Sequence, residues 1–230
     1  MYEYFIAMLL IFILWLIIFF FFKKIRKIIL YNGLLYVGLL IPLFWLHKLL
    51  KNFFNISEMY NPAYWYPNTL FNLNNITSGC GIEDALFMFL FGGIVAIIYD
   101  LVTKNKIEKT QTLLPYLPIS IFLISYILLS FTKINPIYLL IIPSFLGAIA
   151  LIIIRKDLIK NAVYSSILFT LFYFIAFLIF NQIFPYFVND FYNQNAISFF
   201  VLGVPFEDIL YALSFSMMWA PMYKFIKGYK

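Results

Sequence analysis

The sequence is poor in the features on which most water-soluble proteins depend. Only 11% of its 230 residues are charged, and it contains 9 glycines, 1 histidine and 1 cysteine. The single cysteine, Cys80, excludes an internal disulfide and a cysteine metal cluster. No glycine pattern of the kind that cradles a phosphate or a dinucleotide occurs. We therefore expect no flavin, nicotinamide or metal cofactor.

The sequence is instead rich in hydrophobic residues, which form long apolar runs. Hydrophobic residues make up 64% of the chain, which is more than a soluble domain of this size could bury. We therefore predict an all-α, polytopic membrane protein. A run of roughly 20 apolar residues can cross the hydrocarbon core as a helix. Seven such runs occur, at residues 4–22, 28–48, 82–101, 111–131, 136–154, 161–183 and 205–223.

The basic residues divide unevenly between the two sets of alternate connections. All of them except Lys48, Lys51 and Lys133 follow the first, third, fifth or seventh run. Lysine and arginine prefer the cytoplasmic side of short loops. We therefore expect a multi-pass protein of the cell membrane, with its N-terminus outside and its C-terminus in the cytoplasm. This dispersed pattern accounts for the net charge of +6 and predicts no nucleic-acid partner.

The chain also has an internal repeat. Residues 22–32 resemble residues 154–161, and each of these basic segments lies between two apolar runs. Both halves continue with an outer loop rich in aromatic residues and asparagine, and then with an acidic helix start. We predict two parallel three-helix repeats, at residues 1–110 and 136–230, joined by a linking helix within residues 111–135. Both acidic helix starts should then meet at the outer face.

Two adjacent carboxylates open the third run of each half: Glu83 with Asp84, and Glu207 with Asp208. Hydrocarbon gives ionised groups no hydration, so acidic residues of membrane helices usually face the protein interior and mark functional sites. Acidic residues at a helix start can also cap it and complement its dipole. Both interpretations stay open for the two aspartates, whereas we favour a functional role for the glutamates. Asp100, at the inner end of its helix, is expected to be solvated.

Three short motifs and the helix layout point to a known family. The motifs are Pro205-Phe206-Glu207-Asp208, Gly81-Ile82-Glu83-Asp84-Ala85-Leu86-Phe87 and Trp65-Tyr66-Pro67. Together with the layout of three helices, one linking helix and three helices, they resemble the membrane-integral lycopene cyclases. The first acidic motif has Gly81 where that family usually has proline.

The resemblance implies an enzyme, an isomerase of the intramolecular lyase type. It implies a lycopene cyclase that closes β-type rings on an acyclic carotenoid taken from the lipid bilayer. Membrane lipid and other enzymes of carotenoid synthesis are the partners that it suggests.

Ring closure of this kind requires an acid and a base. A terminal trisubstituted double bond is protonated, the ring closes on the tertiary cation, and a proton is lost elsewhere, without net redox change. Paired carboxyl groups away from water can take these different roles. Because Pro205 fixes the backbone at its helix start, we predict Glu207 as the proton donor. Glu83 is predicted as its partner, with Asp84 and Asp208 as supporting catalytic groups.

Aromatic rings provide the π faces that stabilise a cation. Phe87 and Tyr211 each lie one helical turn after the glutamate of an acidic motif. We predict these two residues, with Trp65 and Tyr66, as substrate-binding residues. For most other aromatic residues of the outer loops, Tyr192 among them, we favour a place in the interfacial belt of a membrane protein.

Two other functions stay open. A carotenoid hydratase would form the same cation and add water to it, so only product analysis separates it from a cyclase. A membrane carrier could move protons on its paired acids, although its helices should then break near the middle of the membrane. A retinal photoreceptor is excluded, because residues 205–223 contain no lysine that could hold the chromophore.

Overall fold

The predicted all-α fold is confirmed by a computed structural model, which describes residues 2–76, 80–103, 112 and 114–229. Each of the seven apolar runs contains a helix. These main helices are α1 (Glu3–Phe21), α2 (Arg26–Phe53), α5 (Ile82–Val102), α6 (Leu117–Ser130), α7 (Tyr138–Ile154), α8 (Ile159–Ile183) and α10 (Phe206–Trp219).

Several of these helices have the length and the apolar composition of membrane-spanning helices. Within the described residues, α1, α2, α5 and α8 are long and apolar enough to cross a bilayer, and α6 and α7 are shorter apolar helices. The side chains that α1 and α8 turn away from the protein are mostly apolar and exposed, as expected for a surface in contact with lipid.

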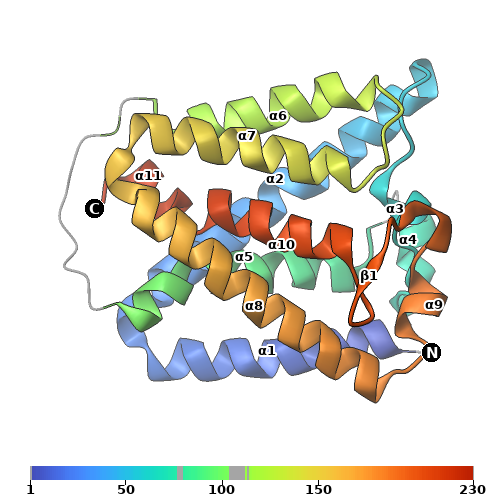
Figure 1. Ribbon diagram of the computed structural model, residues 1–230, viewed down its shortest axis with the longest axis horizontal. Helices are drawn as coiled ribbons and strands as arrows, with labels where there is room; N and C mark the ends of the chain where they lie inside the picture. The colour runs from blue at the N-terminus through green and yellow to red at the C-terminus, as the bar shows by residue number, and fades with distance from the viewer. Residues whose placement is uncertain (1, 77–79, 104–111, 113, 230) are drawn as a thin grey trace.

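The main helices run back and forth between two ends of the molecule (Figure 1). α5 and α10, the helices with acidic starts, both begin at one end, which we call the motif end. The opposite end carries α11 and the basic turns η1 and η3. The shorter elements are η1 (Lys23–Ile25), α3 (Tyr60–Ala63), η2 (Leu70–Asn72), α4 (Leu73–Ile76), η3 (Lys156–Leu158), α9 (Phe187–Phe191), η4 (Gln194–Ala196), β1 (Phe200–Val201), β2 (Val204–Pro205) and α11 (Met222–Lys227).

The two acidic helices lie at the core. α2 packs along α5, and α10 packs against both α7 and α8. These contacts need small residues: a Cβ atom on Gly93 would lie 2.8 Å from a carbonyl oxygen of α2, and one on Gly147 would lie 2.6 Å from the Met218 sulfur. The Asn32 side chain of α2 donates to the carbonyl of Trp219 on α10, with 2.8 Å between nitrogen and oxygen. The elements of the two halves are therefore held together directly.

A short hairpin precedes α10 and positions its first residues. β1 and β2 pair in antiparallel fashion, with Phe200 opposite Pro205. The two turn residues, Leu202 and Gly203, have φ angles of 52° and 84°. A two-residue turn with positive φ at both positions matches the twist of a hairpin and favours glycine. The hairpin thus delivers Pro205 to the position before α10, where its fixed φ suits a helix start.

Two helices, α6 and α10, are clearly shorter than the runs predicted for them, and prolines account for both. The linking helix α6 begins at Leu117, later than residue 111, with Pro118 in its first turn; residues 111 and 113 lie outside the described part of the chain. The last run does not continue to residue 223, because α10 ends at Trp219 and Pro221 precedes α11. Proline lacks the N–H that would continue the helix and crowds the preceding turn.

Candidate active site

The loops that precede α5 and α10 pair with each other at the motif end. Trp65 and Tyr192 form an antiparallel β-bridge. The backbone N–H of Tyr66 donates to the carbonyl of Phe191 (2.9 Å), and that of Asn193 donates to the carbonyl of Tyr64 (3.0 Å). The Trp-Tyr-Pro motif of the first half is therefore held by backbone contacts to the second half, directly beside both acidic helix starts.

Asp84 combines a cap with a contact to another helix. Its Oδ2 accepts a 2.7 Å hydrogen bond from the backbone N–H of Gly81, which satisfies one donor at the start of α5. Its Oδ1 accepts a 2.9 Å hydrogen bond from the hydroxyl of Tyr4 on α1. The Trp65 indole also approaches this carboxyl group. Of the two interpretations that the sequence leaves open for Asp84, capping is therefore confirmed, and one oxygen remains outside the cap.

Asp208 has a different environment, although it occupies the equivalent position on α10. The residue before α10 is Pro205, which has no N–H to donate, and α10 has no side-chain cap. Asp208 instead accepts two tyrosine hydroxyls: Tyr192 at 2.6 Å to Oδ2, and Tyr64 at 3.4 Å to Oδ1. Its side chain is 1% exposed, so these phenols replace water around the carboxyl group.

Glu83 and Glu207 have closely similar surroundings. Both are 0% exposed. Oε1 of Glu83 accepts the backbone N–H of Leu70 at 2.7 Å, and Oε1 of Glu207 accepts the backbone N–H of Ser198 at 2.9 Å. Among the described residues, Oε2 of neither side chain has a hydrogen-bond partner. Each glutamate thus ties the loop that precedes its helix to the helix itself.

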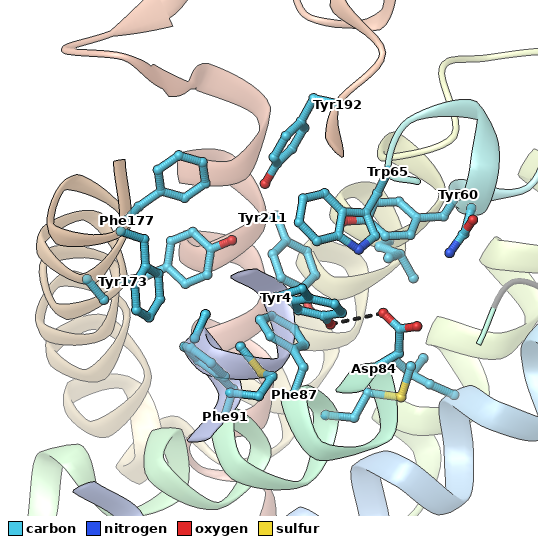
Figure 2. A pocket seen from close by; sticks show the side chains of 18 of the residues that line it. Tyr4, Tyr60, Trp65, Asp84, Phe87, Phe91, Tyr173, Phe177, Tyr192 and Tyr211 are labelled. Carbon is cyan, nitrogen blue, oxygen red and sulfur yellow. Dashed lines mark hydrogen bonds between the residues drawn. The ribbon is translucent and has the colours of Figure 1, made fainter. Parts of the chain in front are cut away.

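A cavity lined mostly by aromatic side chains lies between the two halves (Figure 2). α5 contributes Phe87 and Phe91, α8 contributes Tyr173 and Phe177, and the loops before α5 and α10 contribute Tyr60, Trp65 and Tyr192. Among the described residues, Asp84 is the one acidic side chain that lines it. The cavity volume is about 80 Å³.

The predicted site residues fall at different distances from this cavity. Phe87, Trp65 and Tyr211 line it, and the Tyr211 hydroxyl lies 2.7 Å from that of Tyr36. Tyr66 does not line it, and its hydroxyl donates to the carbonyl of Tyr192 instead.

The four predicted carboxyl groups are likewise separated. Asp84 lines the cavity, and Asp208 is joined to it through the hydroxyl of Tyr192. Glu83 and Glu207 do not line the cavity. All four side chains are nonetheless buried at the same end of the molecule.

Sequence reasoning missed several residues of the cavity. Tyr173, Phe177 and Phe180 are spaced as one face of a helix, a pattern that could have identified them. Tyr4 carries no local signal, because it contacts Asp84 across 80 positions of sequence.

Metal binding has no support in the part of the chain that the structure describes. No group of three or more histidine, cysteine, aspartate and glutamate side chains there could hold a metal ion. The hydrogen-bond donors to the acidic motifs are tyrosine hydroxyls, backbone N–H groups and the Trp65 indole.

Residues 135–226 match the family model described as lycopene cyclase. The matched stretch covers α7, α8, the hairpin, α10 and most of α11, and it contains the acidic motif of the second half together with Tyr192. No curated protein and no solved structure matches the chain.

Proposed function

We propose that this chain, whose residues 135–226 form a lycopene cyclase family domain, closes β-type rings on an acyclic carotenoid such as lycopene. The domain supports a carotenoid cyclase function. The observation that carries the more specific proposal is an aromatic cavity between the two halves with one carboxyl group, that of Asp84, in its lining. A hydrocarbon chain end and a proton donor could meet there.

The reaction proceeds in three steps. The Asp84 carboxyl group, protonated on Oδ1, transfers its proton to the terminal double bond of the substrate. The electron pair of a neighbouring double bond then forms the new carbon–carbon bond and closes the ring. The ring cation loses a proton, so the product is an isomer of the substrate and no redox cofactor or metal is required. We assign the donor role to Asp84 instead of Glu207, because Asp84 is the carboxyl group that lines the cavity.

Aromatic faces stabilise the cation while it exists. Phe87 and Tyr211 lie on the two acidic helices, and Trp65 closes the cavity from the loop above (Figure 2). A cation over an aromatic face gains about 0.5–2 kcal/mol, and the larger value applies when water is excluded. This set of rings therefore favours the charged intermediate over its uncharged precursor, which is the requirement for catalysis.

The proposed enzyme is a seven-span protein of the cell membrane made of two parallel repeats. Two features support this arrangement. α5 and α10 begin at the same end of the molecule, and the basic turns η1 and η3 each follow the first helix of a half at the opposite end. With the positive-inside rule, the motif end faces outward and the carotenoid enters from the surrounding lipid.

Expression in a bacterial host that accumulates lycopene tests the function directly. We expect pigments with closed rings, separated by chromatography, and a yield about 10²–10⁴-fold lower from the variant Asp84→Asn when both proteins reach the membrane at equal levels. Unchanged lycopene from the wild-type chain would contradict the proposal, and a hydroxylated product would indicate a hydratase. The matched control is Asn55→Asp, which adds a carboxyl group on the exposed outer surface and should leave the products unchanged.

A further inference from the structure

Tyr192 stands between a buried carboxyl group and the cavity. Its ring lines the cavity, and its hydroxyl donates to Oδ2 of Asp208 at 2.6 Å. Asp208 itself does not line the cavity. A proton that leaves the cavity toward Asp208 therefore meets the oxygen of Tyr192 first.

The position of the Tyr192 hydroxyl is fixed by both halves of the chain. The residue forms the β-bridge with Trp65, and the two ring centroids are 4.6 Å apart. The Tyr66 hydroxyl donates to the carbonyl of Tyr192 at 2.9 Å. Only 3% of the residue is exposed. An interfacial anchor would face the membrane surface, whereas Tyr192 is locked inward.

A polar recess of the surface lies beside the chain neighbours of the two tyrosines that contact Asp208. Tyr64, whose hydroxyl is 3.4 Å from Oδ1, is also fully buried. Ala63 and Asn193, the chain neighbours of Tyr64 and Tyr192, line this recess with several asparagines, and its volume is about 500 Å³. A water molecule needs only roughly 10–15 Å³, so the recess has room for water beside the chain neighbours of the two tyrosines.

The Tyr192 hydroxyl is protonated, as transfer of a proton to Asp208 requires. Burial raises the pKa of Tyr192 well above the usual value, and the negative charge of Asp208 raises it further. The hydroxyl thus keeps its proton at neutral pH and can pass it to the carboxylate while its oxygen accepts another.

We propose that Tyr192 takes the proton lost by the ring cation and passes its own hydroxyl proton to Asp208, so that this residue decides which ring isomer forms. The inference rests on the proposed function. One carbon–hydrogen bond breaks, its electron pair forms the new ring double bond, and Asp208 becomes protonated as Asp84 has become deprotonated. The charge of the site is thereby conserved in each turnover. The ring cation can lose a proton from three neighbouring carbons, which gives β, ε or γ rings, and the fixed phenol oxygen selects one of them.

The test compares Tyr192→Phe with Tyr64→Phe in lycopene-accumulating cells. Each variant removes one hydroxyl from Asp208, but only Tyr192 lines the cavity. We expect Tyr192→Phe to lower total cyclisation by about 10²-fold, the lower end of the range for proton-transfer groups, and to change the ratio of β, ε and γ rings in what remains. Tyr64→Phe should keep the wild-type ratio, whatever its yield.

A merely structural role for Tyr192 would change the yield and leave the ring-isomer ratio unchanged. A wild-type ratio in Tyr192→Phe, or the same altered ratio in Tyr64→Phe, would therefore overturn the inference. Should Tyr192→Phe fail to accumulate in the membrane, Asp208→Asn keeps the tyrosine and must show the altered ratio in its place. Failure of the proposed function is separate, because the wild-type chain would then form no rings.

Discussion

Adjacent residues on a helix point about 100° apart, and the two neighbouring carboxyl groups of each acidic motif meet different surroundings. At the start of α5, Asp84 turns to the cavity and Glu83 turns to the backbone of Leu70. At the start of α10, Asp208 turns to two tyrosines and Glu207 turns to Ser198. The glutamates thus accept hydrogen bonds from the backbone of the preceding loops, whereas the aspartates accept hydrogen bonds from tyrosine hydroxyl groups at the cavity.

This division gives a prediction for the glutamates. Glutamine can accept the Ser198 N–H through its amide oxygen as glutamate does, but it cannot donate a carboxyl proton. Glu207→Gln should therefore keep cyclisation within about 10-fold of the wild-type chain, whereas Asp84→Asn should lower it by about 10²–10⁴-fold. Pigment yield per unit of membrane protein measures both. Loss of product in Glu207→Gln with retained activity in Asp84→Asn would return the donor role to Glu207, as the sequence prediction had it.

The acidic motifs could be found from the sequence, but the division of roles within them could not. Charge in an apolar run marks Glu83, Asp84, Glu207 and Asp208 without any structure. Which member of each pair faces the cavity depends on the rotation of each helix about its axis, which the packing of α2, α7 and α8 sets. The contact of Tyr4 with Asp84 depends on that packing too.

At the level of elements, the β1–β2 hairpin controls where α10 begins. Gly203 has φ +84° at its turn, and side chains other than glycine are strained there by roughly 1–2 kcal/mol. Gly203→Val should therefore lower the thermal stability of the detergent-solubilised protein by about that free energy. It should also reduce cyclisation, because Glu207 and Asp208 follow the hairpin directly.

Gly38 offers the matched control for this prediction. A Cβ atom added at Gly38, in the middle of α2, would meet nothing within 4 Å. Gly38→Ala should therefore leave stability unchanged or raise it by about 0.5–1 kcal/mol. Equal melting temperatures for the Gly203→Val and wild-type proteins would show that the hairpin does not constrain α10.

The presence of the helices is the part of the fold that the sequence predicts best, and the positions of their ends are the part that it predicts least well. An apolar run predicts a helix because the bilayer requires internal hydrogen bonds, and each of the seven runs contains one. The ends at Leu117 and Trp219 follow from Pro118 and Pro221, which hydropathy does not register. The pairing of Trp65 with Tyr192 brings together segments 127 positions apart, and no local pattern predicts such a contact.

Across the whole molecule, charge is concentrated at the two ends. Away from the motif end, Lys224 of α11 donates to Asp100 of α5 at 2.6 Å, and the Lys224 side chain is only 6% exposed. The expectation that Asp100 is solvated is therefore wrong, because α11 folds back over it. An ion pair this far from the cavity fastens the C-terminal helix to the first half.

This pair predicts a change in stability without a change in chemistry. Asp100→Asn leaves the Lys224 charge buried without its partner, which costs up to about 3 kcal/mol. We expect a lower melting temperature in detergent and an unchanged ratio of ring isomers. The double variant Asp100→Asn with Lys224→Met removes both charges and should recover most of the stability. No recovery would show that the pair is not the origin of the loss.

The membrane topology of the whole chain can be tested with thiol labelling, because its native cysteine is nearly inert. Burial raises the pKa of Cys80 to about 12, so at neutral pH almost none of it is the thiolate that reacts with a maleimide.

A cysteine placed at exposed Lys133, in the α6–α7 connection, should react with a membrane-impermeant maleimide on intact cells. One placed at exposed Lys24, in η1, should react only after the membrane is opened. An odd number of spans requires these opposite results, since three helices, α2, α5 and α6, separate the two positions. Labelling of both positions from the same side would mean that one of these helices does not cross, and the two acidic motifs could not then share the outer face.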